Sequence, residues 1–207
     1  MSIIKKRIVL AYAICFAIIS LSHSVFSDDF KNANLFSAVS KAAEKCDSTA
    51  QFILGSSYYE GNNGLKKDYK KAFYWLMKAA QQNYATAQVS VSNCYLFGNG
   101  VEKNEKESFF WLEKAALLGD INAQHNLGGC YSLGIGVEKN EDNALKWYYK
   151  AAEHGSSASQ FKIGQYYEDG KIVDRNISEA IKWYQKAAAD GYSAAIDKLK
   201  DMIEEKP

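Results

Sequence analysis

All four tryptophans of this chain recur at a fixed interval of 36 residues, at Trp75, Trp111, Trp147 and Trp183. Each lies in a similar stretch: "FYWLMKAAQQN", "FFWLEKAALLG", "KWYYKAAEHG" and "IKWYQKAAADG" in chain order. Self-similarity at a period of this size is typical of repeats that stack on one another. The interval therefore predicts a solenoid before composition is considered.

The first half of each repeat has the pattern of an amphipathic helix. Leu54 and Tyr58 are four residues apart and so share one helix face. A small residue lies between them, and because a glycine inside a helix costs about 1 kcal/mol relative to alanine, its recurrence suggests a close approach by a neighbouring helix. A glycine then ends the helix, as at a left-handed cap. The equivalent positions, called columns below, are Leu54, Val91, Leu127 and Ile163; Gly55, Ser92, Gly128 and Gly164; Tyr58, Tyr95, Tyr131 and Tyr167; and Gly61, Gly98, Gly134 and Gly170.

The second half of each repeat predicts a helix that begins after Asp68, Asn104, Asn140 or Asn176, since Asp and Asn are strong N-caps. It contains the tryptophan and an Ala-Ala pair, and it ends at a glycine or at Asn83. No such hairpin can bury its apolar face alone, so stacking must do so. We therefore expect the tryptophan and tyrosine columns to be structural, with Trp147→Ala costing about 3–5 kcal/mol.

The predicted organisation leaves an extension at each end. Residues 1–27 combine a basic start, the apolar run "IVLAYAICFAIISL" and a small-residue cleavage site, so we interpret them as a bacterial signal peptide. Residues 28–49 and 193–207 are expected to be capping helices. The repeats between them span 50–86, 87–122, 123–158 and 159–192. The mature protein is then expected in the periplasm or secreted, without stable membrane insertion.

The charge balance bears on the class of partner, and the cysteine count bears on disulfide bonding. Without residues 1–27 the chain has 22 basic and 24 acidic residues, which gives no reason to expect nucleic acid as a partner. Cys46, Cys94 and Cys130 then remain, and an odd number leaves at least one thiol unpaired. Cys94 and Cys130 are interpreted as small buried hydrophobic residues, with one disulfide as the alternative.

The repeat resembles the Sel1-like repeat family, relatives of the tetratricopeptide repeats. The stretch "AQHNLGGCYSLGIGVEKNEDNALKWYYKAAEHG" matches the family pattern nearly throughout, and the resemblance covers about residues 50–192. It implies an all-α fold, a right-handed α–α superhelical solenoid of four helix hairpins, that works as an adaptor or scaffold. The departures noted are Asn83, Ser92, Ser108 and Ser159.

Catalytic and metal-binding patterns are weak. His125 has no Cys, Asp or Glu three or four residues away, and His154 lies beside a cap glycine, so we expect no metal and no cofactor. Some family members act on β-lactams, and "SQFK" (Ser159 to Lys162) has the letters of the S-x-x-K motif. Ser159, however, lies in a helix-contact column of alanines, and neither K-T-G nor S-D-N accompanies it. A β-lactamase-like hydrolase is therefore the least favoured alternative.

Protein binding is the favoured hypothesis. By analogy with tetratricopeptide repeats, the first helices line the concave face, where variable and partly apolar columns suit a protein partner. The alternative is that these side chains pack against the neighbouring hairpin. We expect a non-catalytic scaffold or adaptor, or alternatively an immunity protein that neutralises a toxin delivered to the periplasm, such as a phospholipase effector. The candidate binding residues are Phe52, Tyr59, Val89, Asn93, Leu96, Phe97, His125, Leu133, Phe161 and Gln165.

Overall fold

The computed structural model describes the backbone of residues 28–204 and side chains from Phe36 onward. The proposed signal peptide lies outside the described residues. Within them all regular elements are α-helices, which confirms the all-α prediction. The first helices of the four hairpins are α3 (Ser48–Glu60), α5 (Ala85–Phe97), α7 (Ile121–Leu133) and α9 (Ser157–Asp169). The second helices are α4 (Tyr69–Gln81), α6 (Glu105–Leu117), α8 (Glu141–Glu153) and α10 (Ile177–Ala189), and the two outer helices are α2 (Asp28–Glu44) and α11 (Ser193–Glu204).

Capping residues set the helix ends as the sequence predicts. The side chains of Asp68, Asn104, Asn140 and Asn176 each accept a hydrogen bond from a backbone N–H in the first turn of the second helix. The first helices end at glycines in the left-handed region. Asn83 also has a positive φ of 61°, and Cys46, which precedes α3 in the same column, has a φ of 65°.

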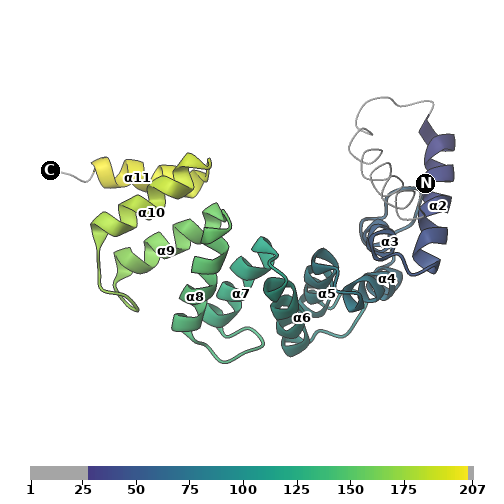
Figure 1. Ribbon diagram of the computed structural model, residues 1–207, viewed down its shortest axis with the longest axis horizontal. Helices are drawn as coiled ribbons and strands as arrows, with labels where there is room; N and C mark the ends of the chain where they lie inside the picture. Colours follow the sequence, from purple (N-terminus) through teal and green to yellow (C-terminus); the bar gives the residue numbers. More distant parts are fainter. Residues whose placement is uncertain (1–27, 205–207) are drawn as a thin grey trace, which may run out of the picture.

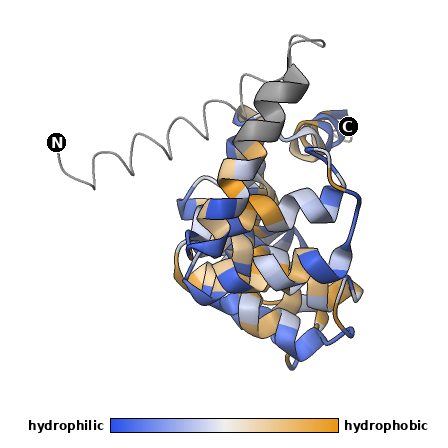
Figure 2. Ribbon diagram, turned by 90° about the vertical axis from the view of Figure 1, so that its right-hand side faces the viewer, coloured by the Kyte–Doolittle hydropathy of each residue, from blue (hydrophilic) through white to orange (hydrophobic). Residues whose placement is uncertain are grey.

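Consecutive helices pack against each other, so the described chain forms an arc (Figure 1). In this view α3, α5 and α7 lie toward the inner side of the arc, and α4, α6 and α8 lie toward the outer side. Figure 2 shows apolar and polar residues interleaved along the helices, as expected when each helix buries only one stripe. The expectation that the first helices line the concave side therefore agrees with the arrangement of α3, α5 and α7.

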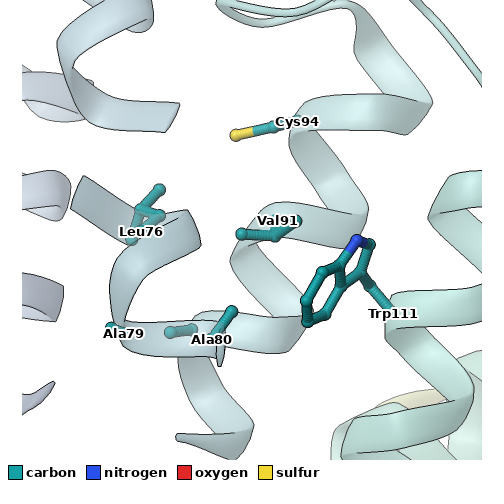
Figure 3. Close-up of a cluster of buried hydrophobic side chains, with 7 residues drawn as sticks. Leu76, Ala79, Ala80, Val91, Cys94 and Trp111 are labelled. Atoms are coloured by element: carbon teal, nitrogen blue, oxygen red, sulfur yellow. The ribbon is translucent and has the colours of Figure 1, made fainter. Parts of the chain in front are cut away.

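The core consists of separate clusters, each built from three or four consecutive helices. Figure 3 shows one of them, in which Leu76 of α4, Val91 and Cys94 of α5, and Trp111 of α6 meet. Trp75, Trp147 and Trp183 occupy the same place in the other clusters. Each tryptophan thus ties its own helix to the first helix before it and to the preceding second helix. The four differ in burial, because only Trp111 is fully buried, at 8% exposure, while the others are half-buried.

The column of small residues marks close helix contacts, as predicted. A Cβ atom at Gly128 would lie 2.8 Å from the ring of Tyr148, and one at Gly164 would lie 2.5 Å from the ring of Tyr184. Repeat two has Ser92 at this position, and its hydroxyl lies 3.0 Å from that of Ser108, with both side chains buried. Ser92 and Ser108, two of the four departures from the repeat pattern, therefore form one hydrogen-bonded pair.

A glutamine column that the sequence reasoning passed over also joins the repeats. Gln51, Gln88 and Gln124 are buried, and each donates from Nε2 to a backbone carbonyl near the end of the preceding helix, at 3.0–3.1 Å. Gln160 is the fourth member and is also buried. These bonds satisfy carbonyls that a helix C-terminus leaves without an intrahelical partner. The recurrence of "AQ" or "SQ" at the start of every repeat was the signal for this role.

The oxygen of this glutamine is satisfied in two repeats only. Gln51 Oε1 accepts from Gln82 at 2.7 Å, and Gln124 Oε1 lies 3.0 Å from His154 Nδ1. Gln88 Oε1 is buried without a hydrogen-bond partner, and Leu118 occupies the position equivalent to Gln82 and His154. A buried acceptor without a donor costs about 1–3 kcal/mol.

We predict that Leu118→Gln stabilises the protein by about 0.5–1.5 kcal/mol, because the new amide can donate to Gln88 Oε1 as Gln82 donates to Gln51. Urea unfolding of purified wild type and variant measures the difference. Leu117→Gln is the matched control, since it makes the same change at the neighbouring exposed residue. Equal effects of the two substitutions would contradict the assignment.

Candidate functional site

Two large apolar side chains are exposed on adjacent repeats of the first-helix face. Phe97 ends α5 and Leu133 ends α7, and they are 66% and 73% exposed. They share a column whose other members are Glu60 and Asp169. Exposed apolar residues at equivalent positions of neighbouring repeats form a stripe rather than isolated points, and such stripes are typical of interaction surfaces.

A small cavity of about 170 Å³, the α3–α5 cavity, lies on the N-terminal side of this stripe. It brings together two of the predicted residues, Tyr59 of α3 and Asn93 of α5. The Tyr59 hydroxyl accepts a hydrogen bond from Asn99 Nδ2 at 2.8 Å, and its ring contacts Tyr69 edge-on at a centroid distance of 5.0 Å. Tyr59 is therefore a fixed wall of the cavity.

A larger cavity of about 380 Å³, the α7–α9 cavity, lies on the C-terminal side. Its walls include the predicted residue Gln165, together with Ser132, Glu141 and Tyr166. Glu141 Oε2 accepts from the hydroxyls of Ser132 and Tyr166, and Oε1 lies 3.1 Å from Lys139 Nζ. Burial acts to raise the pKa of Glu141, but these hydrogen bonds outweigh it and hold the pKa below its ordinary value.

Four of the predicted binding residues pack against other side chains of the solenoid. Phe52 lies against Tyr84 at a centroid distance of 5.2 Å, and Phe161 lies at 5.2 Å from Tyr184 and 5.4 Å from Tyr192. Val89 packs against the cluster of α6 and α7. His125 lies against Tyr148, and Leu96 is half-buried. The packing alternative therefore accounts for Phe52, Val89, His125 and Phe161 without a partner.

The serine of the S-x-x-K letters is enclosed in the core. Ser159 has 0% exposure, and its hydroxyl lies 2.8 Å from His125 Nδ1. A nucleophile must reach its substrate and needs a base oriented by a third group. Among the described residues, no carboxylate is hydrogen-bonded to His125. This geometry supports a structural serine-histidine pair, and it also explains why serine replaces alanine at this position.

The burial of His125 predicts a pH dependence of stability. Burial, with a smaller effect of the Lys162 ammonium, lowers the pKa of His125 below its ordinary value. The folded state then binds fewer protons than the unfolded state between the two pKa values. The stabilisation is complete above the unfolded pKa of about 6.5 and is lost as the pH falls from there toward the folded pKa.

We expect the free energy of unfolding to decrease from pH 7.5 to pH 5, and His125→Phe to reduce that decrease, because this column already holds Phe52 and Phe161. Urea unfolding at several pH values measures the slope for each protein. Wild type measured in the same series is the reference. An unchanged slope in His125→Phe would contradict the assignment.

The tyrosine and tryptophan columns were predicted to be structural, and their side chains do make contacts with neighbouring helices. Tyr95 and Tyr131 meet Phe73 and Phe109 edge-on, the Tyr167 hydroxyl lies 2.9 Å from that of Tyr149, and Lys71 lies over the Tyr58 ring. A lysine three residues after each tryptophan lies over its indole, at 4.1–5.3 Å from the ring centroid. Such cation–π contacts at exposed sites contribute about 0.5–1 kcal/mol each.

The described cysteines are free thiols. Cys94 and Cys130 are buried, and burial raises the pKa of each to about 11, with a smaller contribution from Glu105 at Cys130. Cys46 is exposed. Among the side chains described, from Phe36 onward, no cluster of three or more His, Cys, Asp or Glu could hold a metal ion. No described helix is long and apolar enough to cross a membrane.

Comparisons with known proteins identify related repeats. The family model described as Sel1 repeat matches residues 48–84, 85–120, 121–156 and 157–192. The protective antigen c5321 of uropathogenic Escherichia coli, described as displaying an SLR fold, is 35% identical with a TM-score of 0.77, over 81% of this chain and 36% of that one. A Sel1 repeat protein from Oxalobacter formigenes is 38% identical with a TM-score of 0.69, over 72% of this chain and 60% of that one.

A third solved structure shares the fold at lower identity. The immunity protein PA5088 from Pseudomonas aeruginosa is 23% identical with a TM-score of 0.58, over 90% of this chain and 67% of that one. No curated protein matches the sequence significantly. The chain spans less than two thirds of the Escherichia coli and Oxalobacter proteins, so their similarity concerns the repeats they share with it.

Proposed function

Because this chain belongs to the Sel1 repeat family, whose fold is typical of protein–protein interaction, we propose that it is an exported, non-catalytic scaffold or adaptor that binds a partner protein through its inner face. The observation that carries the proposal is the pair Phe97 and Leu133, exposed at the ends of the inner helices α5 and α7 of adjacent repeats. Two cavities flank the pair, one on each side. An apolar centre with polar surroundings resembles the core and rim of a protein interface.

Export is part of the proposal and rests on the sequence. The basic start, short apolar run and small-residue cleavage site of residues 1–27 support delivery to the periplasm or the medium. Mass spectrometry of the protein from a bacterial periplasmic fraction tests it, with an N-terminus at Asp28 as the expected result. A protein that retains residues 1–27 in the cytoplasmic fraction would contradict export.

Immunity to a periplasm-delivered toxin is a second candidate. PA5088, which is described as an immunity protein, shares this fold over 90% of the chain, and that likeness supports this candidate. In that case the partner would be a secreted effector, for example a phospholipase, bound tightly enough to inhibit it. If a toxin gene lies beside this one, co-expression with that toxin distinguishes the two candidates, because an immunity protein rescues growth and an adaptor does not.

We predict that Phe97→Glu together with Leu133→Glu abolishes partner binding, because two charges replace the apolar centre of the surface. The melting temperature should stay within a few degrees of wild type, since both side chains are more than 60% exposed. Quantitative affinity capture from the native periplasm, followed by titration of the purified partner, measures the effect.

The matched control for this prediction is Tyr74→Glu with Phe110→Glu. These two aromatic residues are 52% and 45% exposed and lie on the second helices α4 and α6. The control should leave binding unchanged. Equal loss of binding in both double variants, or wild-type binding by the Phe97 and Leu133 variant, would exclude the inner face as the binding surface.

A further inference from the structure

Repeat four departs from the other repeats in the loop between its helices. Gly100 and Gly136 lie at equivalent positions of repeats two and three, where a Cβ atom would stand 1.9 Å and 2.0 Å from the carbonyl oxygens of Tyr69 and Glu105. Only glycine permits that approach to the first turn of the preceding second helix. The equivalent residue of repeat four is Ile172. Ile172 packs its side chain against the cluster of α8 and α9, and it also lines the α7–α9 cavity.

A second departure lines the same cavity. Tyr166 stands in the column that elsewhere holds the small residues Ser57, Cys94 and Cys130. Its ring lies 6.2 Å from that of Tyr148, and its hydroxyl donates to Glu141. Two residues that break the repeat pattern thus meet in one cavity, which gives this junction a shape that the other junctions lack.

The ionic groups around the cavity leave one cation unpaired. Both oxygens of Glu141 are engaged, by Lys139, Ser132 and Tyr166. Lys171 pairs with Asp169 at 3.3 Å. Lys162 also lines the cavity and has no ion-pair partner among the described residues. The five charged residues of the lining therefore carry a net positive charge, located at Lys162.

We propose that the α7–α9 cavity receives an acidic side chain of the partner protein, with its carboxylate on Lys162 and its methylene groups against Tyr148 and Ile172. This inference rests on the proposed protein-binding function and assigns a chemical class to part of the surface. Gln165 offers an amide beside Lys162 as a further hydrogen-bond donor. A single charged pair in a partly enclosed cavity provides selectivity for a carboxylate more than it provides affinity.

Two-dimensional NMR with small blocked peptides tests the assignment without the partner. Acetyl-Ala-Glu-Ala-amide should shift the side-chain signals of Gln165 and the ring signals of His125, since Lys162 acts on His125 electrostatically. The glutamine peptide acetyl-Ala-Gln-Ala-amide should produce at least fivefold smaller shifts at equal concentration. Lys162→Gln should reduce the response to the glutamate peptide by a similar factor. The wild-type response to this peptide should also be weaker in 0.5 M NaCl, because salt screens exposed charges.

Lys146→Gln is the matched control, because Lys146 is exposed on α8 and does not line the cavity. This variant should respond like wild type. Equal shifts with the glutamate and glutamine peptides, or an unchanged response in Lys162→Gln, would overturn the proposal. A stronger response to acetyl-Ala-Ala-Ala with a free C-terminus would assign the site to a chain terminus and overturn the side-chain assignment. None of these results depends on partner capture, so failure here is separate from failure of the Phe97 and Leu133 test.

Discussion

Gly136→Ala should destabilise the protein by about 2–4 kcal/mol. The new methyl group would lie 2.0 Å from the carbonyl oxygen of Glu105 and 2.9 Å from Cβ of Phe109, and φ is 70°. The positive φ costs about 1 kcal/mol or more for a residue with a side chain, and a forced displacement of packed backbone adds about 1–3 kcal/mol. For a chain of this size the melting temperature should fall by roughly 10 °C, which thermal unfolding followed by circular dichroism measures.

Gly64→Ala separates the two causes. Gly64 lies in the same column with a φ of 79°, but no atom lies within 4 Å of its Cβ position. This control should therefore lose only the conformational part, about 1 kcal/mol. If Gly64→Ala and Gly136→Ala lower the melting temperature equally, the close approach of the loop to α6 contributes nothing.

Trp111→Ala should cost about 4 kcal/mol, which is typical of a large buried aromatic side chain. The indole is 8% exposed and contacts α4 and α5 from α6 (Figure 3). Its loss removes the contact between two second helices as well as the contact within the hairpin. Because repeat proteins are held together by neighbour contacts, unfolding should also become less cooperative, with repeat one separating from repeats three and four.

Two other variants give destabilisation values with which the effect of Trp111→Ala can be compared. Trp147→Ala should cost less, about 3 kcal/mol, because Trp147 is half-buried. Phe110→Ala changes the neighbouring residue, which is 45% exposed, and should cost under about 1 kcal/mol. Urea unfolding of the three variants gives both the free energies and the cooperativity. Equal costs for Trp111 and Phe110 would show that the cluster does not depend on the indole.

The sequence predicted the elements and their ends because these depend on local chemistry. Asn104 and Asn140 cap their helices through bonds to the first turn, whatever the helix packs against. Gly128 indicates a close helix contact because it has no side chain. Neither inference requires knowledge of which repeats touch. The arrangement of helices then followed from the period of 36 residues.

The candidate site was harder to predict because its contacts join residues that are far apart in the sequence. A variable column shows only that its members differ from one repeat to the next. His125 differs from the apolar residues of its column, and its polar ring matches the hydroxyl of Ser159. Phe97 and Leu133 belong to another variable column and are exposed. Sequence variation alone could not separate these two cases. Ile172 carried a usable signal, since it replaces a glycine of the repeat pattern, but its consequence depends on how closely the loop approaches the helix before it.

The paired departures bear on how such a chain can be rearranged in evolution. Ser92 and Ser108 belong to one repeat, so a duplication or deletion of repeat two moves both together. His125 and Ser159, Tyr149 and Tyr167, and Glu141 and Tyr166 instead span repeats three and four. Separating those two repeats would leave three pairs of polar side chains without their hydrogen-bond partners. Repeat two shares with its neighbours the glutamine bonds that recur along the chain and one further bond, from Asn99 to Tyr59. Repeats three and four depend on each other through three additional pairs, so we expect them to be inherited together more often than apart.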